Sequence, residues 1–305
     1  MTQLITDVNV FDRLKAWWNG YEWEPHPHAR EEKSPSEDAE DEDNFPQPGE
    51  RREWTPERVH VAQLIFGAGC HGPDMSARTS EMIAPLGLTP EATALEIGAG
   101  LGMCSRTLVS KTGAWIDAIE PNECLAAAGR RLAAQSPNSD KLTLTSNELT
   151  DPSITRRRRD AVLFCESLHR FDTPEAVLKQ IRGLMKPSAY LILTDYFLAD
   201  EAEPGDIAEW VAMHAGAVRP FKLEALRSKL SNLGFEIHSV HDETENYAAA
   251  AMKAMQTFAR RINDRPVELR WRQWVMVEIE FWARTVTLLE SGKLKNHRIS
   301  ASIHP

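Results

Sequence analysis

The stretch with the clearest chemical meaning is Leu95-Glu96-Ile97-Gly98-Ala99-Gly100-Leu101-Gly102, where an apolar run leads into three alternating glycines. Glycine permits a tight turn after a strand and lets the backbone approach a ligand closely, with the following helix N-terminus directed at it. The spacing is GxGxG, whereas dinucleotide sites use GxGxxG. The carboxylate of Glu96 would repel a pyrophosphate, but it suits a ligand that carries an ammonium group.

A second acid, Glu120, ends the next apolar run, in the sequence DAIEPN. A carboxylate about 20 residues beyond the glycines can accept hydrogen bonds from ribose hydroxyls. Glu96 and Glu120 together predict a nucleoside ligand with a cationic, phosphate-free tail, for which S-adenosylmethionine is the obvious candidate. The alternative is an ordinary tight turn between a strand and a helix.

Three further side chains are expected at the carboxyl edge of a parallel sheet, where ligands bind in such folds. His169 follows the fourth apolar run, and imidazole can act as a general base near neutral pH. Asp195 and Tyr196 follow the fifth run. The alternatives are a structural histidine in the core and side chains that cap a strand end.

Apolar strands alternate with helical patterns from Pro56 onwards, which predicts a doubly wound α/β fold with a parallel sheet. Expected strands cover 93–97, 115–119, 142–145, 161–165, 190–194, 236–240 and 297–303. Expected helices cover 103–111, 122–135, 173–185, 221–233, 245–263 and 266–291.

The whole chain is expected to divide into three parts. Residues 1–28 are expected to form a lid helix, and the acidic, Pro- and Ser-rich residues 29–52 a disordered linker. Residues 53–305 form the main domain, with cap insertions at about 197–220 and 245–291.

Charge and cysteine content narrow the functional classes. The net charge of −10 comes mostly from residues 31–43, which hold eight acids and one lysine, so the rest is nearly neutral. This argues against nucleic-acid binding, and Arg156–Arg159 is interpreted as the solvated start of a strand. The four cysteines form no CxxC pair, and Cys70 and His71 have no further ligands at metal-binding spacing, so we expect free thiols and no metal. Without a secretory signal, the expected location is cytoplasmic.

The motif block at 93–200 resembles class I S-adenosylmethionine-dependent methyltransferases. The resemblance implies a seven-stranded Rossmann-like sheet whose last strand is antiparallel between strands five and six. It assigns Glu96, Gly98, Gly100 and Gly102 to the methionine part of the cofactor and Glu120 to the ribose. Glu148, in LTSNEL, takes the place of the acid that meets the adenine amine, and Cys165 is also expected at the cofactor.

Four blocks are similar to the phosphoethanolamine and sarcosine/dimethylglycine N-methyltransferases. They are Ile65–Gly72, resembling FGxGxxSxGG, then Cys165–His169, Leu193–Tyr196, and Asp242–Tyr247, resembling DxSxxY. Cys70-His71-Gly72-Pro73 departs from the first pattern, so we expect a different substrate pocket. The resemblance assigns Cys70, His71, Glu166 and Tyr247 to the substrate.

The expected activity is methyl transfer from S-adenosylmethionine to a heteroatom, preferably nitrogen, of a small molecule. Glu166 or Asp195 would hold a cationic substrate, and Tyr196 or Tyr247 would face it. The alternatives are an S- or O-methyltransferase, a lipid-directed enzyme with Trp17, Trp18 and Trp23 at a membrane interface, and a non-catalytic binding protein. The oligomeric state is open, with a dimer as one option.

Overall fold

The computed structural model describes residues 53–303, except 215 and 265–266. The expected lid helix and acidic linker therefore lie outside the described residues. Within the described part of the chain, no helix is both long and apolar enough to cross a membrane.

The centre of the fold is a seven-stranded sheet with the order β3-β2-β1-β4-β5-β7-β6. Strand β7 runs antiparallel to both of its neighbours, and the other strand pairs are parallel. The fold class is as predicted from the sequence pattern, and the position of the antiparallel strand is as the family resemblance implies. The strands are β1 (Thr93–Ile97), β2 (Trp115–Ile119), β3 (Leu142–Thr145), β4 (Arg159–Cys165), β5 (Met185–Leu198), β6 (Phe235–Asp242) and β7 (Leu294–Ile303).

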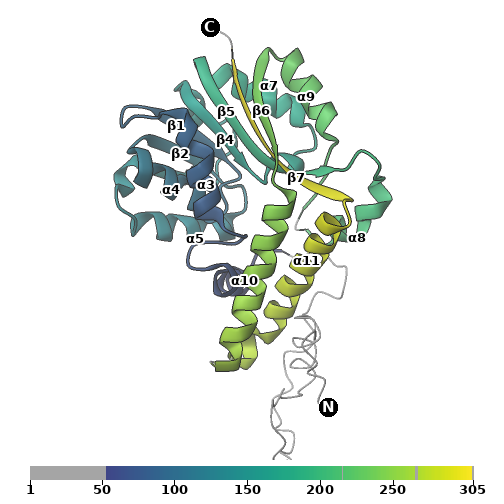
Figure 1. Cartoon of the computed structure of the whole chain (residues 1–305). Coiled ribbons are helices and arrows are strands. Elements are labelled where there is room, and N and C mark those ends of the chain that lie inside the picture. The colour runs from purple at the N-terminus through teal and green to yellow at the C-terminus, as the bar shows by residue number, and fades with distance from the viewer. Residues whose placement is uncertain (1–52, 215, 265–266, 304–305) are drawn as a thin grey trace, which may run out of the picture.

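Helices pack on both faces of this sheet (Figure 1). Buried side chains of α4 and α5 meet one face, and those of α7 and α9 meet the other. Among the described residues the helices are α2 (Pro56–Phe66), α3 (Met75–Ile83), α4 (Met103–Thr112), α5 (Glu123–Ala134), α6 (Pro152–Thr155), α7 (Pro174–Leu184), α8 (Ala208–Ala212), α9 (Leu223–Asn232), α10 (Thr244–Asp264) and α11 (Arg272–Glu290).

A separate apolar cluster joins α2, α8, α10 and α11 to the carboxyl end of β5. The long helices α10 and α11 lie side by side and extend away from the sheet (Figure 1). Trp210 and Trp282 are among the largest side chains buried in this cluster. The cluster therefore forms a wall over the edge of the sheet at which ligands bind in parallel folds.

Two sequence predictions need correction. The segment 197–220, expected as a cap, begins inside β5, because β5 pairs with β7 as far as Leu198. Arg159 is not part of a solvated strand start, because it is 1% exposed. Its guanidinium pairs with Asp117 of β2 at 2.5 Å and donates to the carbonyl of Ile154 at 3.1 Å.

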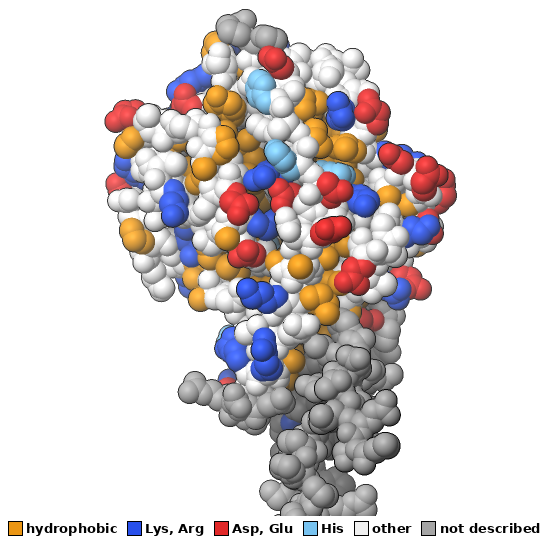
Figure 2. All heavy atoms as spheres, in the orientation of Figure 1, with side chains coloured by type: hydrophobic (Ala, Val, Ile, Leu, Met, Phe, Trp, Pro, Cys, Tyr) orange, Lys and Arg blue, Asp and Glu red, His pale blue; other side chains and the backbone are white. Residues whose placement is uncertain are grey.

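Acidic and basic side chains are interspersed over the face in Figure 2, and neither sign gathers into a large patch. A nucleic-acid site usually requires a coherent basic surface. This face therefore gives no support to nucleic-acid binding.

Candidate active site

The glycine turn joins β1 to α4, and its three glycines have φ values that favour glycine. These are 76° at Gly98, 55° at Gly100 and 71° at Gly102. A Cβ atom on Gly98 would lie 2.2 Å from Cβ of Ser167, and one on Gly100 would lie 2.2 Å from Cε1 of His71. Close packing at this turn therefore comes from the chain's own residues as well as from any ligand.

Glu96 lies buried just before the turn. Its carboxylate accepts a hydrogen bond from the hydroxyl of Ser105 on α4. Burial raises the pKa of Glu96 to about 7, and the nearby charge of Glu120 adds to the rise, whereas Ser105 opposes it. A positively charged ligand would shift Glu96 back towards its ionised form.

Glu120 follows β2 and is 3% exposed. One of its oxygens accepts the backbone N–H of Gly100, and the other accepts that of Asn122, each at 2.8 Å. Glu120 therefore holds the glycine turn against the carboxyl end of β2.

A cavity opens along the carboxyl ends of β1, β4 and β5 and holds about 850 Å³ of space, part of it open to solvent. One end, here called the acid–glycine end, is formed by Glu96, Gly98, Ala99 and Glu120. The other, the aromatic end, is formed by Tyr196, His214, Tyr247, Phe281 and Trp282.

The two tyrosines of the aromatic end touch each other. Their hydroxyl oxygens are 2.8 Å apart, and burial raises the pKa of both phenols. Both rings therefore remain neutral, with polarised hydroxyls at the cavity surface. The guanidinium of Arg78 lies 4.4 Å from the centre of the Tyr247 ring.

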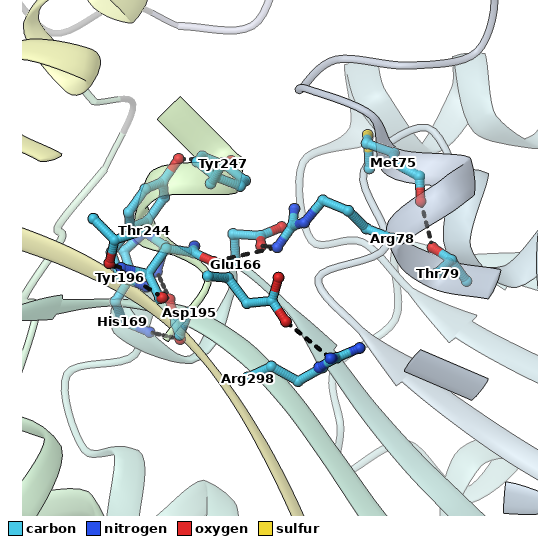
Figure 3. Close-up of polar contacts among 12 residues, drawn as sticks. Met75, Arg78, Thr79, Glu166, His169, Asp195, Tyr196, Thr244, Tyr247 and Arg298 are labelled. Atoms are coloured by element: carbon cyan, nitrogen blue, oxygen red, sulfur yellow. Dashed lines mark hydrogen bonds and ion pairs between the residues drawn. The ribbon is translucent and has the colours of Figure 1, made fainter. Parts of the chain in front are cut away.

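Two ion pairs line the same cavity. Arg78 of α3 reaches Glu166 at 2.8 Å (Figure 3), and Arg58 of α2 pairs with Glu278 of α11 at 2.5 Å. Glu166 was expected to hold a cationic substrate, but here its charge is balanced by Arg78.

His169 and Asp195 lie beneath the cavity wall and do not line it. The carboxylate of Asp195 contacts Nδ1 of His169 (Figure 3) and accepts the backbone N–H groups of His169 and Tyr196 at 3.0 and 2.8 Å. Among the described residues, Nε2 of His169 has no hydrogen-bond partner. The imidazole contacts Tyr196 edge to face, so the pair reaches the cavity through Tyr196.

His214 is a cavity residue that the sequence did not single out. Its Nδ1 donates to the carbonyl of Trp210 at 2.9 Å, which leaves Nε2 as a hydrogen-bond acceptor. Burial, followed by the charge of His169, holds its pKa well below the usual value, so the ring is neutral. The only indication of His214 in the sequence was its position in the expected cap insertion at 197–220.

The other predicted residues divide between the cavity and its surroundings. His71 and Cys165 line the cavity, and Cys70 is buried nearby without lining it. Gly100 and Gly102 belong to the glycine turn but do not line the cavity. Glu148 is exposed and lies outside the cavity lining, where it accepts a hydrogen bond from Thr150.

Within the described residues, the ligand atoms of Glu96, Cys104 and Cys165 lie within 4.8 Å of one another. The pKa of Cys165 is well above its ordinary value, owing to its hydrogen bond with Cys104 and to burial. Cys104 and Cys165 are free thiols that contact each other through a hydrogen bond.

A family model described as a methyltransferase domain matches residues 74–240. The chain belongs to this methyltransferase family, which confirms the family resemblance and, at the level of the family, S-adenosylmethionine as its cofactor.

Known proteins similar to the chain differ in their methyl acceptors. A sterol 24-C-methyltransferase of Gibberella zeae is 24% identical over 199 residues, covering 62% of this chain and 52% of that protein. The chain thus spans about half the length of the curated relatives it matches.

Two solved structures share the fold. The phosphoethanolamine N-methyltransferase 2 of Haemonchus contortus, in complex with phosphomonomethylethanolamine and S-adenosylhomocysteine, has a TM-score of 0.69 at 15% identity, covering 82% of this chain and 58% of that one. The cyclopropane synthase MmaA2 of Mycobacterium tuberculosis has a TM-score of 0.68 at 11% identity, covering 81% and 94%.

Proposed function

We propose that this chain is an S-adenosylmethionine-dependent methyltransferase that acts on a heteroatom, preferably nitrogen, of a small molecule. The observation that carries the proposal is one cavity with two chemically different ends. The acid–glycine end suits a cationic nucleoside, and the aromatic end suits an acceptor that must lose water before it reacts.

At the acid–glycine end, Glu96 would face the ammonium and sulfonium charges and Glu120 the ribose hydroxyls. The backbone at Gly98 and Ala99 leaves room for the methionine part. Bound S-adenosylmethionine supplies an electrophilic methyl group on a good leaving group. The protein then needs chiefly to position and desolvate the acceptor.

The aromatic end supports this task. Tyr196, Tyr247 and Trp282 exclude water, and their ring faces attract cationic groups. Nε2 of His214 can accept a hydrogen bond from the acceptor and orient its lone pair. The pair of His169 and Asp195 would act through Tyr196, by fixing the backbone and ring that form the wall.

A carbon acceptor is the second candidate. The sterol relatives and the cyclopropane synthase support it, and so do aromatic rings that could stabilise a developing carbocation. Transfer to an amine leaves a proton to be lost from nitrogen, whereas transfer to an alkene requires its loss from carbon. Mass spectrometry of products made from methyl-labelled cofactor separates the two.

The first experiment is a screen of amines, thiols, hydroxy acids and sterols with methyl-labelled S-adenosylmethionine. We expect label in an amine product, with one S-adenosylhomocysteine formed for each methyl transferred. Cofactor that binds without any turnover would favour the non-catalytic alternative. Label found only in sterols would favour the carbon acceptor.

The role of His169 is tested by His169→Ala, with His238→Ala as its control, because His238 is exposed and contacts Ser302 on the sheet edge. If His169 supports the chemistry by positioning Tyr196, kcat falls in His169→Ala and the affinity for the cofactor is kept. Normal turnover would leave His169 with a structural role.

A further inference from the structure

Among the described residues that line the cavity, Arg170 is the one arginine without an ion-pair partner. Arg170 ends the 3-10 turn η4 (Leu168–Arg170) after β4 and lines the cavity. Its side chain has no hydrogen-bond or ion-pair partner among the described residues, and its backbone N–H is held by the carbonyl of Ser167 at 3.1 Å.

The other charged side chains that line the cavity are paired with each other or lie at the end proposed for the cofactor. Arg58 is paired with Glu278, and Arg78 with Glu166. Glu96 and Glu120 stand at the opposite, acid–glycine end, where the proposed cofactor carries positive charge. Within the described part of the chain, the exposed guanidinium of Arg170 is therefore a cavity charge without a compensating partner.

Three cavity residues respond to this guanidinium. After burial, the charge of Arg170 is the largest influence that lowers the pKa of His71, to about 3. It also contributes, after larger effects, at His214 and at Tyr196. His214 and Tyr196 belong to the aromatic end, so the electrostatic effect of Arg170 extends to the part of the cavity where the acceptor would lie.

We propose that Arg170 binds an anionic group of the methyl acceptor, a carboxylate or a phosphate, and thereby selects small anionic acceptors over neutral ones. The inference rests on the proposed function and names its substrate class. Guanidinium matches both anions because its parallel N–H donors bind two oxygens at once. A sterol, which has no such group, would leave this charge without a partner.

The test uses full-length wild type, Arg170→Gln and Arg170→Lys. Arg219→Gln is the matched control, because Arg219 is an exposed arginine paired with Asp172 and does not line the cavity. Calorimetry first measures S-adenosylhomocysteine binding, and then inorganic phosphate and acetate binding to the loaded protein. Acceptors are compared in pairs with and without the anion, namely phosphoethanolamine with ethanolamine and glycine with its methyl ester.

We expect all four proteins to bind S-adenosylhomocysteine alike. Wild type and Arg219→Gln should bind either phosphate or acetate. If they bind phosphate, they should prefer phosphoethanolamine to ethanolamine, and if they bind acetate, they should prefer glycine to its methyl ester. Arg170→Gln should lose about 10- to 150-fold in kcat/KM for that acceptor, as for a lost hydrogen bond to a charged group. Arg170→Lys should recover part of this loss. Binding of phosphate would indicate that the acceptor carries a phosphate group, and binding of acetate that it carries a carboxylate.

Other outcomes would overturn the inference. They are no anion binding by the loaded wild type, equal use of both members of each pair, or equal losses on both in Arg170→Gln. Anion binding that appears only after the acids of 31–43 are replaced by amides would assign Arg170 to the chain's own acidic segment. Failure of the proposed function is distinct, because it appears as absent S-adenosylhomocysteine binding, as no turnover of any acceptor, or as label found only in sterols.

Discussion

At the scale of single residues, the carboxyl group of Glu96 makes the site sensitive to pH. Its pKa rises from 4.5 to about 7 on folding, mainly through burial. Burial disfavours the ionised carboxylate, so the fold carries no such penalty below pH 4.5 and loses stability as pH rises from 4.5 towards 7. The rise corresponds to a contribution on the order of 3 kcal/mol.

Glu96→Gln should therefore flatten two pH profiles. Relative to the variant, the ligand-free wild type should lose stability between pH 4.5 and 7, measured by chemical unfolding. Its affinity for S-adenosylmethionine should rise by up to about 10-fold per pH unit below pH 7, because the cation requires the ionised carboxylate. Parallel profiles for the two proteins would refute this role of Glu96.

Gly100 provides a second test at the residue scale. The sequence suggested that a side chain here would obstruct the cofactor, but the first obstacle is the ring of His71. Gly100→Ala should lose more stability and more cofactor affinity than Gly87→Ala. Gly87 has nearly the same φ, at 56°, but open space around its Cβ position. Equal losses in thermal unfolding would mean that backbone strain alone is responsible.

At the scale of elements, the buried pair of Arg58 and Glu278 joins α2 to α11 at the cavity wall. Glu278→Ala would remove the carboxylate that balances the buried guanidinium of Arg58, so we expect a lower unfolding free energy. The double variant Arg58→Met, Glu278→Leu should lose less than Glu278→Ala alone. A larger loss in the double variant would contradict this account.

The elements also show what could be predicted from the sequence. The first three strands match their predicted ranges because each is a short apolar run that ends at a turn. Strand β5 was predicted too short at both ends, and its last four residues, 195–198, are held by pairing with β7. The buried pairing of Arg159 with Asp117 joins residues 42 positions apart, and no local pattern encodes it.

Site residues that belong to local sequence motifs could be predicted, whereas those brought in by long-range packing could not. Glu96, Gly98, Glu120, Glu166, Tyr196 and Tyr247 belong to local motifs, and all of them line the cavity. His214, Arg58 and Trp282 lie outside those motifs and reach the cavity only because α2, α8 and α11 pack together. Long-range packing of that kind leaves no periodic or motif signal.

At the scale of the whole molecule, the role of residues outside the described part can be tested by deletion. Removing 31–50 should leave the melting temperature and cofactor affinity almost unchanged, because this segment has almost no apolar side chains to bury. Removing 8–23, the predicted lid, should lower turnover more than cofactor affinity. A drop of several degrees in the first case, or equal losses in the second, would contradict these expectations.

The central claim is that one cavity takes the cofactor at its acid–glycine end and the acceptor at its aromatic end. It is tested most directly by measuring the S-adenosylmethionine Kd and the acceptor KM in Glu120→Ala and Tyr247→Ala. The exposed Glu175→Ala, at a surface pair with Lys229, is the control. We predict that Glu120→Ala raises the cofactor Kd by about 10- to 150-fold and that Tyr247→Ala raises only the acceptor KM. Absent cofactor binding in the wild type, or equal effects of both variants on both constants, would contradict the account.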